Sequence, residues 1–147
     1  MKRVIYCDMD GVLADFNAEP NGVERFRTEK GFFYKLKPIE ENVRGLQELA
    51  RSNEVYILTA SPNTRADKDK IKWLKKYVKF IDIKNVIICR NGQKKVDFMA
   101  NSCAGILLDD YGKNISEWLE KKNNIAWKIT PTRTIQSLVG TINFTQM

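Results

Sequence analysis

The sequence of 147 residues contains no histidine. This absence excludes catalysis by Ser-His-Asp triads and Cys-His pairs, phosphohistidine chemistry, and zinc sites that use imidazole ligands. Catalytic and metal-binding groups must therefore come from carboxylates, lysines, hydroxyls or a hard cation.

Long apolar runs are also absent. Runs such as residues 86–89 fall far short of the ~20 residues that a membrane-spanning helix needs. The chain begins Met-Lys-Arg and passes directly into a strand-like segment, without the apolar stretch and small residues typical of a signal peptide. We therefore expect a cytoplasmic protein with no membrane partner.

Cysteine is scarce, and its spacing fits neither metal binding nor catalysis. Cys7, Cys89 and Cys103 form no CxxC pair, and no arginine stands six residues beyond any of them, which excludes the cysteine-phosphatase pattern. All three lie in or beside apolar segments. We expect them to be buried as small apolar side chains.

The charge is unbalanced towards the basic side. Apolar residues make up 43% of the chain and charged residues 29%, with a net charge of +7, as in a globular protein that binds anionic substrates, nucleic acid or an acidic partner. Residues 65–84 are rich in lysine and arginine. We expect five of these lysines to form the solvated face of a helix, an interpretation we favour over a nucleic-acid surface: Lys68, Lys72, Lys75, Lys76 and Lys79.

Short apolar runs alternate with amphipathic helical patterns. This alternation predicts a single α/β domain with a parallel sheet and helices on both faces, because the runs are apolar throughout. The predicted strands are residues 4–7, 55–58, 86–89, 106–108 and 125–129. Residues 17–38 do not fit the pattern, and we interpret them as a small cap inserted over the site.

Polar residues follow three of the predicted strands, in Asp8-Met9-Asp10-Gly11, Thr59-Ala60-Ser61 and Asp109-Asp110. Ligands of open parallel sheets bind at the carboxyl ends of the strands. Four carboxylates without nitrogen or thiolate ligands favour Mg²⁺, and a hydroxyl with nearby backbone N–H groups suits a phosphate. Two alternatives stay open: the first motif can be a plain turn, and Thr59 can be a helix N-cap.

These motifs resemble those of the haloacid-dehalogenase superfamily, which occur in the same order with a lysine before the last one. The string Asp-Met-Asp-Gly-Val-Leu-Ala-Asp-Phe at residues 8–16 resembles the 5'(3')-deoxyribonucleotidase branch. The resemblance covers nearly the whole chain, and the other segments that carry it are residues 31–33 with Pro38, 58–62, Lys70-x-x-Trp73 and 109–114. It implies a three-layer Rossmann-like fold of the haloacid-dehalogenase type.

The resemblance also implies catalytic and metal-binding roles. Asp8 would attack phosphorus and form an aspartyl-phosphate, while Asp10 would protonate the leaving oxygen and then activate water. Asp8, the backbone carbonyl of Asp10 and Asp110 would hold Mg²⁺, with Asp109 in support.

Phosphate binding is implied for a second group of residues. Thr59 would hold a phosphoryl oxygen with the backbone of Ala60, and the motif lysine best matches Lys95, with Lys94 as the fallback. Lys70 would also reach the phosphate, unless it is a lysine on the surface of its helix.

The resemblance implies a substrate class as well. We expect a magnesium-dependent phosphomonoester hydrolase acting on deoxyribonucleoside monophosphates. The same chemistry on phosphorylated nucleic-acid ends or other phosphate esters is an alternative, as is a non-enzymatic nucleic-acid or regulatory binding module. The inserted segment is short, and Phe32 and Phe33 are its candidates for stacking on a nucleobase; alternatively they anchor the cap in the core.

Overall fold

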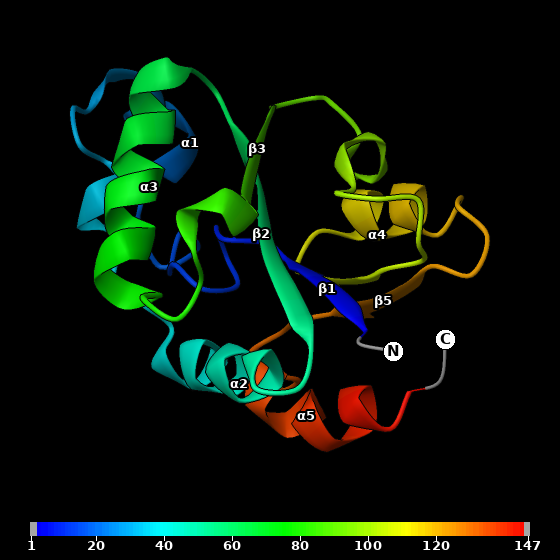
Figure 1. Ribbon diagram of the computed structural model, residues 1–147. Coiled ribbons are helices and arrows are strands. Elements are labelled where there is room, and N and C mark those ends of the chain that lie inside the picture. Colours follow the sequence, from blue (N-terminus) through cyan, green and yellow to red (C-terminus); the bar gives the residue numbers. More distant parts are fainter. Residues whose placement is uncertain (1–2, 146–147) are drawn as a thin grey trace.

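The computed structural model describes residues 3–145, which contain a five-stranded, entirely parallel sheet (Figure 1). The strand order is β3-β2-β1-β4-β5. The strands are β1 (Val4–Cys7), β2 (Glu54–Ser61), β3 (Val86–Arg90), β4 (Ile106–Asp109) and β5 (Ile125–Lys128). All five match the predicted segments. β2 continues to Ser61, so Thr59 and Ala60 belong to the strand itself.

Four of the described α-helices lie in the connections between strands, and the fifth follows the last strand. The α-helices are α1 (Gly22–Thr28), α2 (Glu40–Ala50), α3 (Thr64–Tyr77), α4 (Gly112–Trp118) and α5 (Ile135–Asn143). Three short 3₁₀ helices join them: η1 (Phe33–Lys35), η2 (Ile83–Asn85) and η3 (Lys95–Phe98).

Alternate residues of β1 enter two different cores, as the pleat of a strand requires. Ile5 and Cys7 belong to the larger core, which includes apolar side chains of α2, α3 and α5. Tyr6 faces the smaller core and packs edge-on against Trp118 of α4, with 5.1 Å between the ring centroids. Figure 1 shows α2 and α5 together on one side and α4 on the other. The sheet is therefore covered on both faces, which confirms the predicted three-layer α/β fold.

The segment between β1 and α2 leaves the sheet and returns to almost the same place. The backbone N–H of Asp15 donates to the Lys37 carbonyl at 2.8 Å, and that of Ile39 donates to the Leu13 carbonyl at 2.7 Å. Between these bonds lie α1 and η1. The Trp73 indole N–H of α3 donates to the Leu36 carbonyl at 2.8 Å and fastens the excursion to the domain.

Two expectations about single residue types are tested here. The five lysines Lys68, Lys72, Lys75, Lys76 and Lys79 are all exposed, which confirms the solvated face along α3 and just beyond it. Cys7 and Cys89 are buried, but Cys103 is exposed. The expectation was wrong for Cys103 because it lies in the irregular segment before β4, outside both cores.

Within residues 3–145, no helix has both the length and the apolar character to cross a bilayer.

Candidate active site

The site lies where β1 and its neighbours end. β1 pairs with β2 on one side and with β4 on the other, and the Asp8 N–H donates to the Leu108 carbonyl at 2.9 Å, one residue beyond the end of β1. The chain crosses from β3 to β4 on the far side of β1, so β1 stands at the point where the order of the strands reverses. Ligands of parallel sheets bind at such a point.

Asp8 is buried immediately beyond β1. Its Oδ1 atom accepts hydrogen bonds from the Met9 N–H at 2.9 Å and from the Lys95 ammonium at 2.8 Å. Both bonds end on Oδ1, so within the described chain Oδ2 keeps its lone pairs free of protein donors. One oxygen of a fixed carboxylate is thereby left available to a reacting atom or a cation.

Lys95 is the lysine that reaches this carboxylate. Its side chain is 2% exposed, and Nζ lies 2.8 Å from Asp8 Oδ1 and 2.8 Å from Asp109 Oδ2. Burial alone would lower the pKa of Lys95, but the two carboxylates raise it above its usual value. Lys94 points outward and pairs with Glu120 at 3.3 Å, so it does not enter the site.

Asp109 and Asp110 differ in how their oxygens are used. Asp109 is fully buried; Oδ1 accepts from the Tyr111 N–H at 2.9 Å, and Oδ2 accepts from Lys95 and from the Asn114 amide at 3.2 Å. Asp110 receives one hydrogen bond, from the Asn17 amide to Oδ2 at 3.3 Å. Asp109 therefore positions Lys95, and Asp110 is free to bind a ligand.

The three carboxylates carry more negative charge than the protein neutralises. Oxygens of Asp8, Asp109 and Asp110 lie within 4.8 Å of one another, and the Lys95 ammonium contacts two of these groups. Burial raises the pKa of Asp8 to about 6, against the opposing effect of Lys95, and that of Asp109 also to about 6. Burial and the Asp109 charge raise the pKa of Asp110. Excess charge on hard oxygen ligands fits a divalent cation of the Mg²⁺ type.

Lys70 holds a second group of site residues together. It is fully buried, and Nζ lies 2.6 Å from Asp10 Oδ2, 3.0 Å from Thr59 Oγ1 and 2.6 Å from the Ala60 carbonyl. The alternative of a surface lysine is wrong: Lys70 follows Ala66 by four residues and precedes Trp73 by three, so it lies on the buried face of α3.

The structure excludes the alternative of a helix cap for Thr59. The N-cap of α3 is Asn63, whose side chain accepts from the Ala66 N–H at 2.9 Å, so Thr59 is not the cap. Ala60 presents its carbonyl to Lys70. Asp10 Oδ1 is buried and has no hydrogen-bond partner in the described residues, so one acceptor beside Lys70 stays unpaired.

Phe32 and Phe33 are placed in the interior. They are 2% and 3% exposed and pack with Phe16 and Phe26, with centroid separations between 5.3 and 6.5 Å. The Phe33 ring lies 4.5 Å from Lys70 Nζ, within the range of a cation–π contact. Stacking on a nucleobase requires an open ring face, which neither residue has here, so anchoring of the cap is the role that the structure supports.

Gly11 and Asn17 complete the Asp110 environment, and Asn17 was not singled out from the sequence. Gly11 has φ +83°, and a Cβ at this position would lie 2.1 Å from Asp110 Oδ2. Asn17 donates to the same oxygen. Only the glycine in the DxDG motif gave a signal, because a sharp exit from a strand favours glycine.

Replacement of Gly11 by alanine should lower activity at least about 100-fold, because the new methyl group must displace the Asp110 carboxylate. Gly31→Ala is the matched control: Gly31 also has a positive φ, +73°, but its nearest neighbour would be Lys35 Cε at 3.8 Å. Both variants should lose about 1–2 kcal/mol of stability from the left-handed backbone. Hydrolysis rates and urea unfolding measure the two effects, and equal activity of both variants would contradict the role of Gly11.

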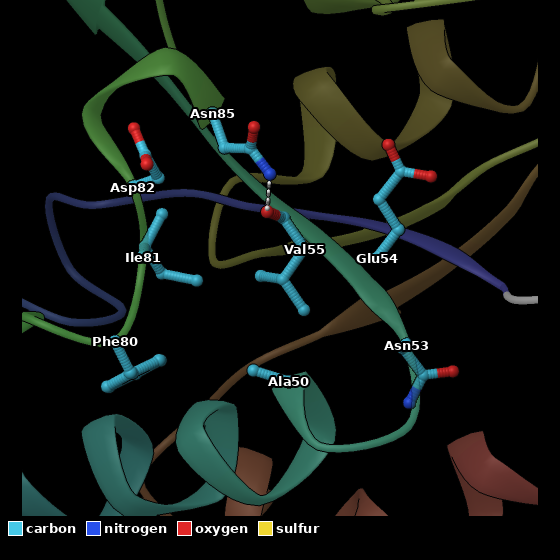
Figure 2. A pocket seen from close by; sticks show the side chains of 8 residues that line it. All are labelled: Ala50, Asn53, Glu54, Val55, Phe80, Ile81, Asp82 and Asn85. Atoms are coloured by element: carbon cyan, nitrogen blue, oxygen red, sulfur yellow. Dashed lines mark hydrogen bonds between the residues drawn. The ribbon is translucent and has the colours of Figure 1, made fainter.

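A separate hollow of about 340 Å³ lies at the opposite edge of the sheet, beside the start of β2 (Figure 2). Two of its polar groups are occupied internally: the Asn85 amide donates to the Val55 carbonyl at 3.1 Å, and the Asp82 carboxylate accepts from the Lys84 N–H at 3.0 Å. The catalytic residues expected from the sequence lie at the other end of the strand, so we place no site here.

Comparison with known proteins places the chain among nucleotidases. The profile of the family "5' nucleotidase, deoxy (Pyrimidine), cytosolic type C protein" matches residues 17–137. A 5'(3')-deoxyribonucleotidase of Bacillus subtilis strain 168 is 31% identical over 121 residues, which cover 62% of this chain and 70% of that protein.

Two solved structures share the fold. The haloacid-dehalogenase domain of the effector protein Lem4 from Legionella pneumophila has a TM-score of 0.56 at 17% identity and covers 97% of this chain and 94% of its own. A chain of the Pnkp1/Rnl/Hen1 complex has a TM-score of 0.64 at 17% identity and 88% coverage of this chain, which spans 46% of that longer one. Both confirm the fold class.

Proposed function

The chain belongs to the family of cytosolic type C 5'-nucleotidases, which hydrolyse phosphate monoesters on a haloacid-dehalogenase-like fold. We propose that it removes phosphate from deoxyribonucleoside monophosphates with the help of Mg²⁺. One observation carries the proposal. The buried Asp8 carboxylate has a free oxygen, is held by the Lys95 ammonium, and stands within a cluster whose negative charge exceeds that of its protein partners.

The chemistry begins at Asp8. Its free oxygen Oδ2 attacks phosphorus while the bond from phosphorus to the leaving oxygen breaks, which produces an aspartyl-phosphate and an alcohol. Asp10 gives its proton to the leaving oxygen. Asp10 then removes a proton from water, which attacks phosphorus and releases inorganic phosphate and the Asp8 carboxylate.

Lys70 positions two residues: the proposed general acid Asp10, and Thr59, which would donate a hydrogen bond to the phosphate. An ammonium group has three protons, and the three acceptors at Asp10, Thr59 and Ala60 use all of them. The Thr59 oxygen accepts from Lys70, and its hydroxyl donates only a long hydrogen bond of 3.5 Å to the Ala60 carbonyl, which a phosphoryl oxygen can replace. We therefore propose that Thr59 contacts the phosphate directly and that Lys70 acts by fixing Thr59 and Asp10.

The residues that would hold Mg²⁺ are Asp8, Asp110 and the backbone carbonyl of Asp10. When bound, the ion would offset the negative charge of the Asp8 carboxylate and the phosphoryl oxygens, so that the two anions can approach. Asp109 has both oxygens occupied and would orient Lys95.

We propose that residues 17–38 act as a small cap. Backbone hydrogen bonds join the start and the end of the segment, from Asp15 to Lys37 and from Ile39 to Leu13, so it is inserted without interrupting the sheet. We assign residues 1–147 to one phosphatase domain that contains this insertion.

Hydrolysis should require Mg²⁺ and stop when a chelator is added. Rates of phosphate release from a panel of phosphate esters, with and without Mg²⁺, measure this requirement. Mg²⁺ at 100 times its dissociation constant should stabilise the fold by about 2.7 kcal/mol, a rise in Tm of about 5–10 °C. The rise should be smaller at pH 5 than at pH 7.5, because protons occupy carboxylates whose pKa is about 6.

Asp110→Asn should reduce this Mg²⁺-dependent rise in Tm, whereas Asp97→Asn, on an exposed residue of η3, should leave it unchanged. Activity that resists the chelator, together with an unchanged Tm in Mg²⁺, would refute the metal assignment.

Phosphorylated nucleic-acid ends are a second candidate substrate. A groove of about 390 Å³ lies between the cap and α3, with the exposed ring of Tyr34 on its wall. Its charged lining residues are three basic ones and one carboxylate: Lys30, Arg65, Lys72 and Asp69. If a nucleic-acid strand binds in this groove, the rate of hydrolysis of an oligonucleotide end should exceed that of a mononucleotide and should fall steeply with salt concentration.

A further inference from the structure

A pocket of about 370 Å³ opens directly from the phosphate-binding region. Its inner wall includes Ala60 and Lys95. The Ala60 carbonyl accepts from Lys70, which also holds Asp10, and the Lys95 ammonium holds Asp8. Its outer wall consists of residues 91–93, from the loop after β3, together with the first part of α4. A group esterified to a phosphate at Asp8 would extend into this space.

Tyr111 offers an aromatic surface at the mouth of the pocket. Its side chain is 57% exposed, while its backbone N–H is held by Asp109 Oδ1 at 2.9 Å. The residue is therefore fixed next to the acidic cluster with its ring free. In the cap, Phe32 and Phe33 are buried, and the exposed ring of Tyr34 lines the separate groove beside α3.

The remaining lining groups are polar and carry both signs of charge. Asn91, Lys113 and Glu117 lie on the pocket wall, and none of the three makes a side-chain hydrogen bond or ion pair within residues 3–145. Such a wall offers hydrogen-bonding partners to the edges of a flat aromatic group, which an aliphatic leaving group would not use.

We propose that this pocket is the nucleoside subsite and that the ring of Tyr111 stacks on the nucleobase. The ligand class is an aromatic heterocycle carried on a sugar phosphate. The inference rests on the proposed phosphatase function, and it assigns base recognition to the loop after β3 and the start of α4, on the opposite side of the site from the cap.

Binding to the Mg²⁺-loaded Asp8→Asn protein, measured by calorimetry, tests the subsite without turnover. Tyr111→Ala should weaken binding of a deoxyribonucleoside monophosphate about 5- to 150-fold, the range for loss of one stacked base. Deoxyribose 5-phosphate, which has no base, should bind with unchanged affinity. Tyr111→Phe should retain the wild-type preference, because the ring is kept.

The control is Phe144→Ala, an 86% exposed ring just beyond α5, next to Thr145, whose carbonyl accepts from Arg3 at the opposite edge of the sheet. It should change neither affinity. Equal weakening of both ligands by Tyr111→Ala, or a base-dependent loss in Tyr34→Ala instead, would overturn the subsite.

Failure of the subsite can be told apart from failure of the proposed function. If the wild-type protein hydrolyses the deoxynucleotide and the sugar phosphate, and Tyr111→Ala leaves the ratio of their KM values unchanged, only the subsite is wrong. If the wild-type protein hydrolyses no phosphate ester in Mg²⁺, the proposed function falls, and the subsite with it.

Discussion

Asp8→Asn should abolish phosphate-ester hydrolysis, with a loss of the order of 10⁴- to 10⁶-fold, as expected for removal of a nucleophile. The amide is nearly the same size as the carboxylate but does not form a stable acyl phosphate. Its carbonyl oxygen can still accept the hydrogen bonds that Met9 and Lys95 donate to Oδ1. The folded structure should therefore persist.

Stability provides an independent check on the same variant. Burial raises the pKa of Asp8 to about 6, above the ~3.9 of an unfolded aspartate. A carboxyl group whose pKa rises on folding destabilises the protein once the pH exceeds the unfolded value, and this cost is complete above the folded value. Asparagine removes it, so at pH 7.5 without Mg²⁺ the Tm of Asp8→Asn should be no lower than that of the wild type.

Asp15→Asn is the matched control, because Asp15 is half-buried in the same segment, and its carboxylate makes no hydrogen bond or ion pair in the described residues. It should keep wild-type hydrolysis. A folded Asp8→Asn protein that retains more than a small fraction of the wild-type rate would end the proposed mechanism.

Lys95→Met should cause the largest combined loss of stability and activity. The substitution removes the ammonium shared by Asp8 and Asp109 and leaves two buried carboxylates without their cation. Breaking a buried pair in this way costs about 3–5 kcal/mol. Hydrolysis should fall roughly 10²- to 10³-fold as well, because the charge that offsets Asp8 and the phosphate is gone.

The destabilisation should depend on pH in a defined direction. Without Lys95, the pKa values of Asp8 and Asp109 rise further above about 6, so the folded variant retains protons that the unfolded chain releases. Its stability then continues to fall as the pH rises from 6 to 8, where the wild-type carboxylates are already largely ionised. Urea unfolding of both proteins at pH 5 and pH 8 measures the difference, which should be larger at pH 8.

Lys94→Met controls for the loss of a positive charge at the neighbouring position. Lys94 is exposed, and its ion pair with Glu120 is on the surface, so the change should cost less than about 1 kcal/mol at either pH. If the two lysine variants behaved alike, Lys95 would have no special part in the acidic cluster.

The fold was predictable because the buried strands are marked by short apolar runs between turn residues. The same rule located much of the site: in a parallel sheet Asp8, Thr59 and Asp109 must meet at one edge, since each lies at or near the carboxyl end of a strand. The choice of Lys95 over Lys94 depended on family resemblance, because one residue in an irregular segment decides which side chain points inward.

The burial of Lys70 and of the two cap phenylalanines could not be predicted in the same way. Lysine on the inner face of a helix contradicts its usual preference for solvent, and its partners Asp10 and Thr59 are distant in the sequence. In the sequence, a phenylalanine that stacks on a base cannot be told from one that packs in the core, and this holds for Phe32 and Phe33. Their orientation is set by tertiary contacts, such as the bond between Trp73 and the Leu36 carbonyl.

The central place of β1 has a consequence for synthesis on the ribosome. Ile5 pairs with Val55 of β2 and, on its other side, with Ile106 of β4. Once β1, β2 and β3 have left the ribosome, they can form three strands of the sheet. The backbone N–H and C=O groups along the other edge of β1 then stay unpaired until β4 emerges. We expect this incomplete sheet to be the state most prone to aggregation. Asp8 also lacks Asp109 and Asp110 in this state, so we expect the growing chain to be inactive on phosphate esters until β4 has docked.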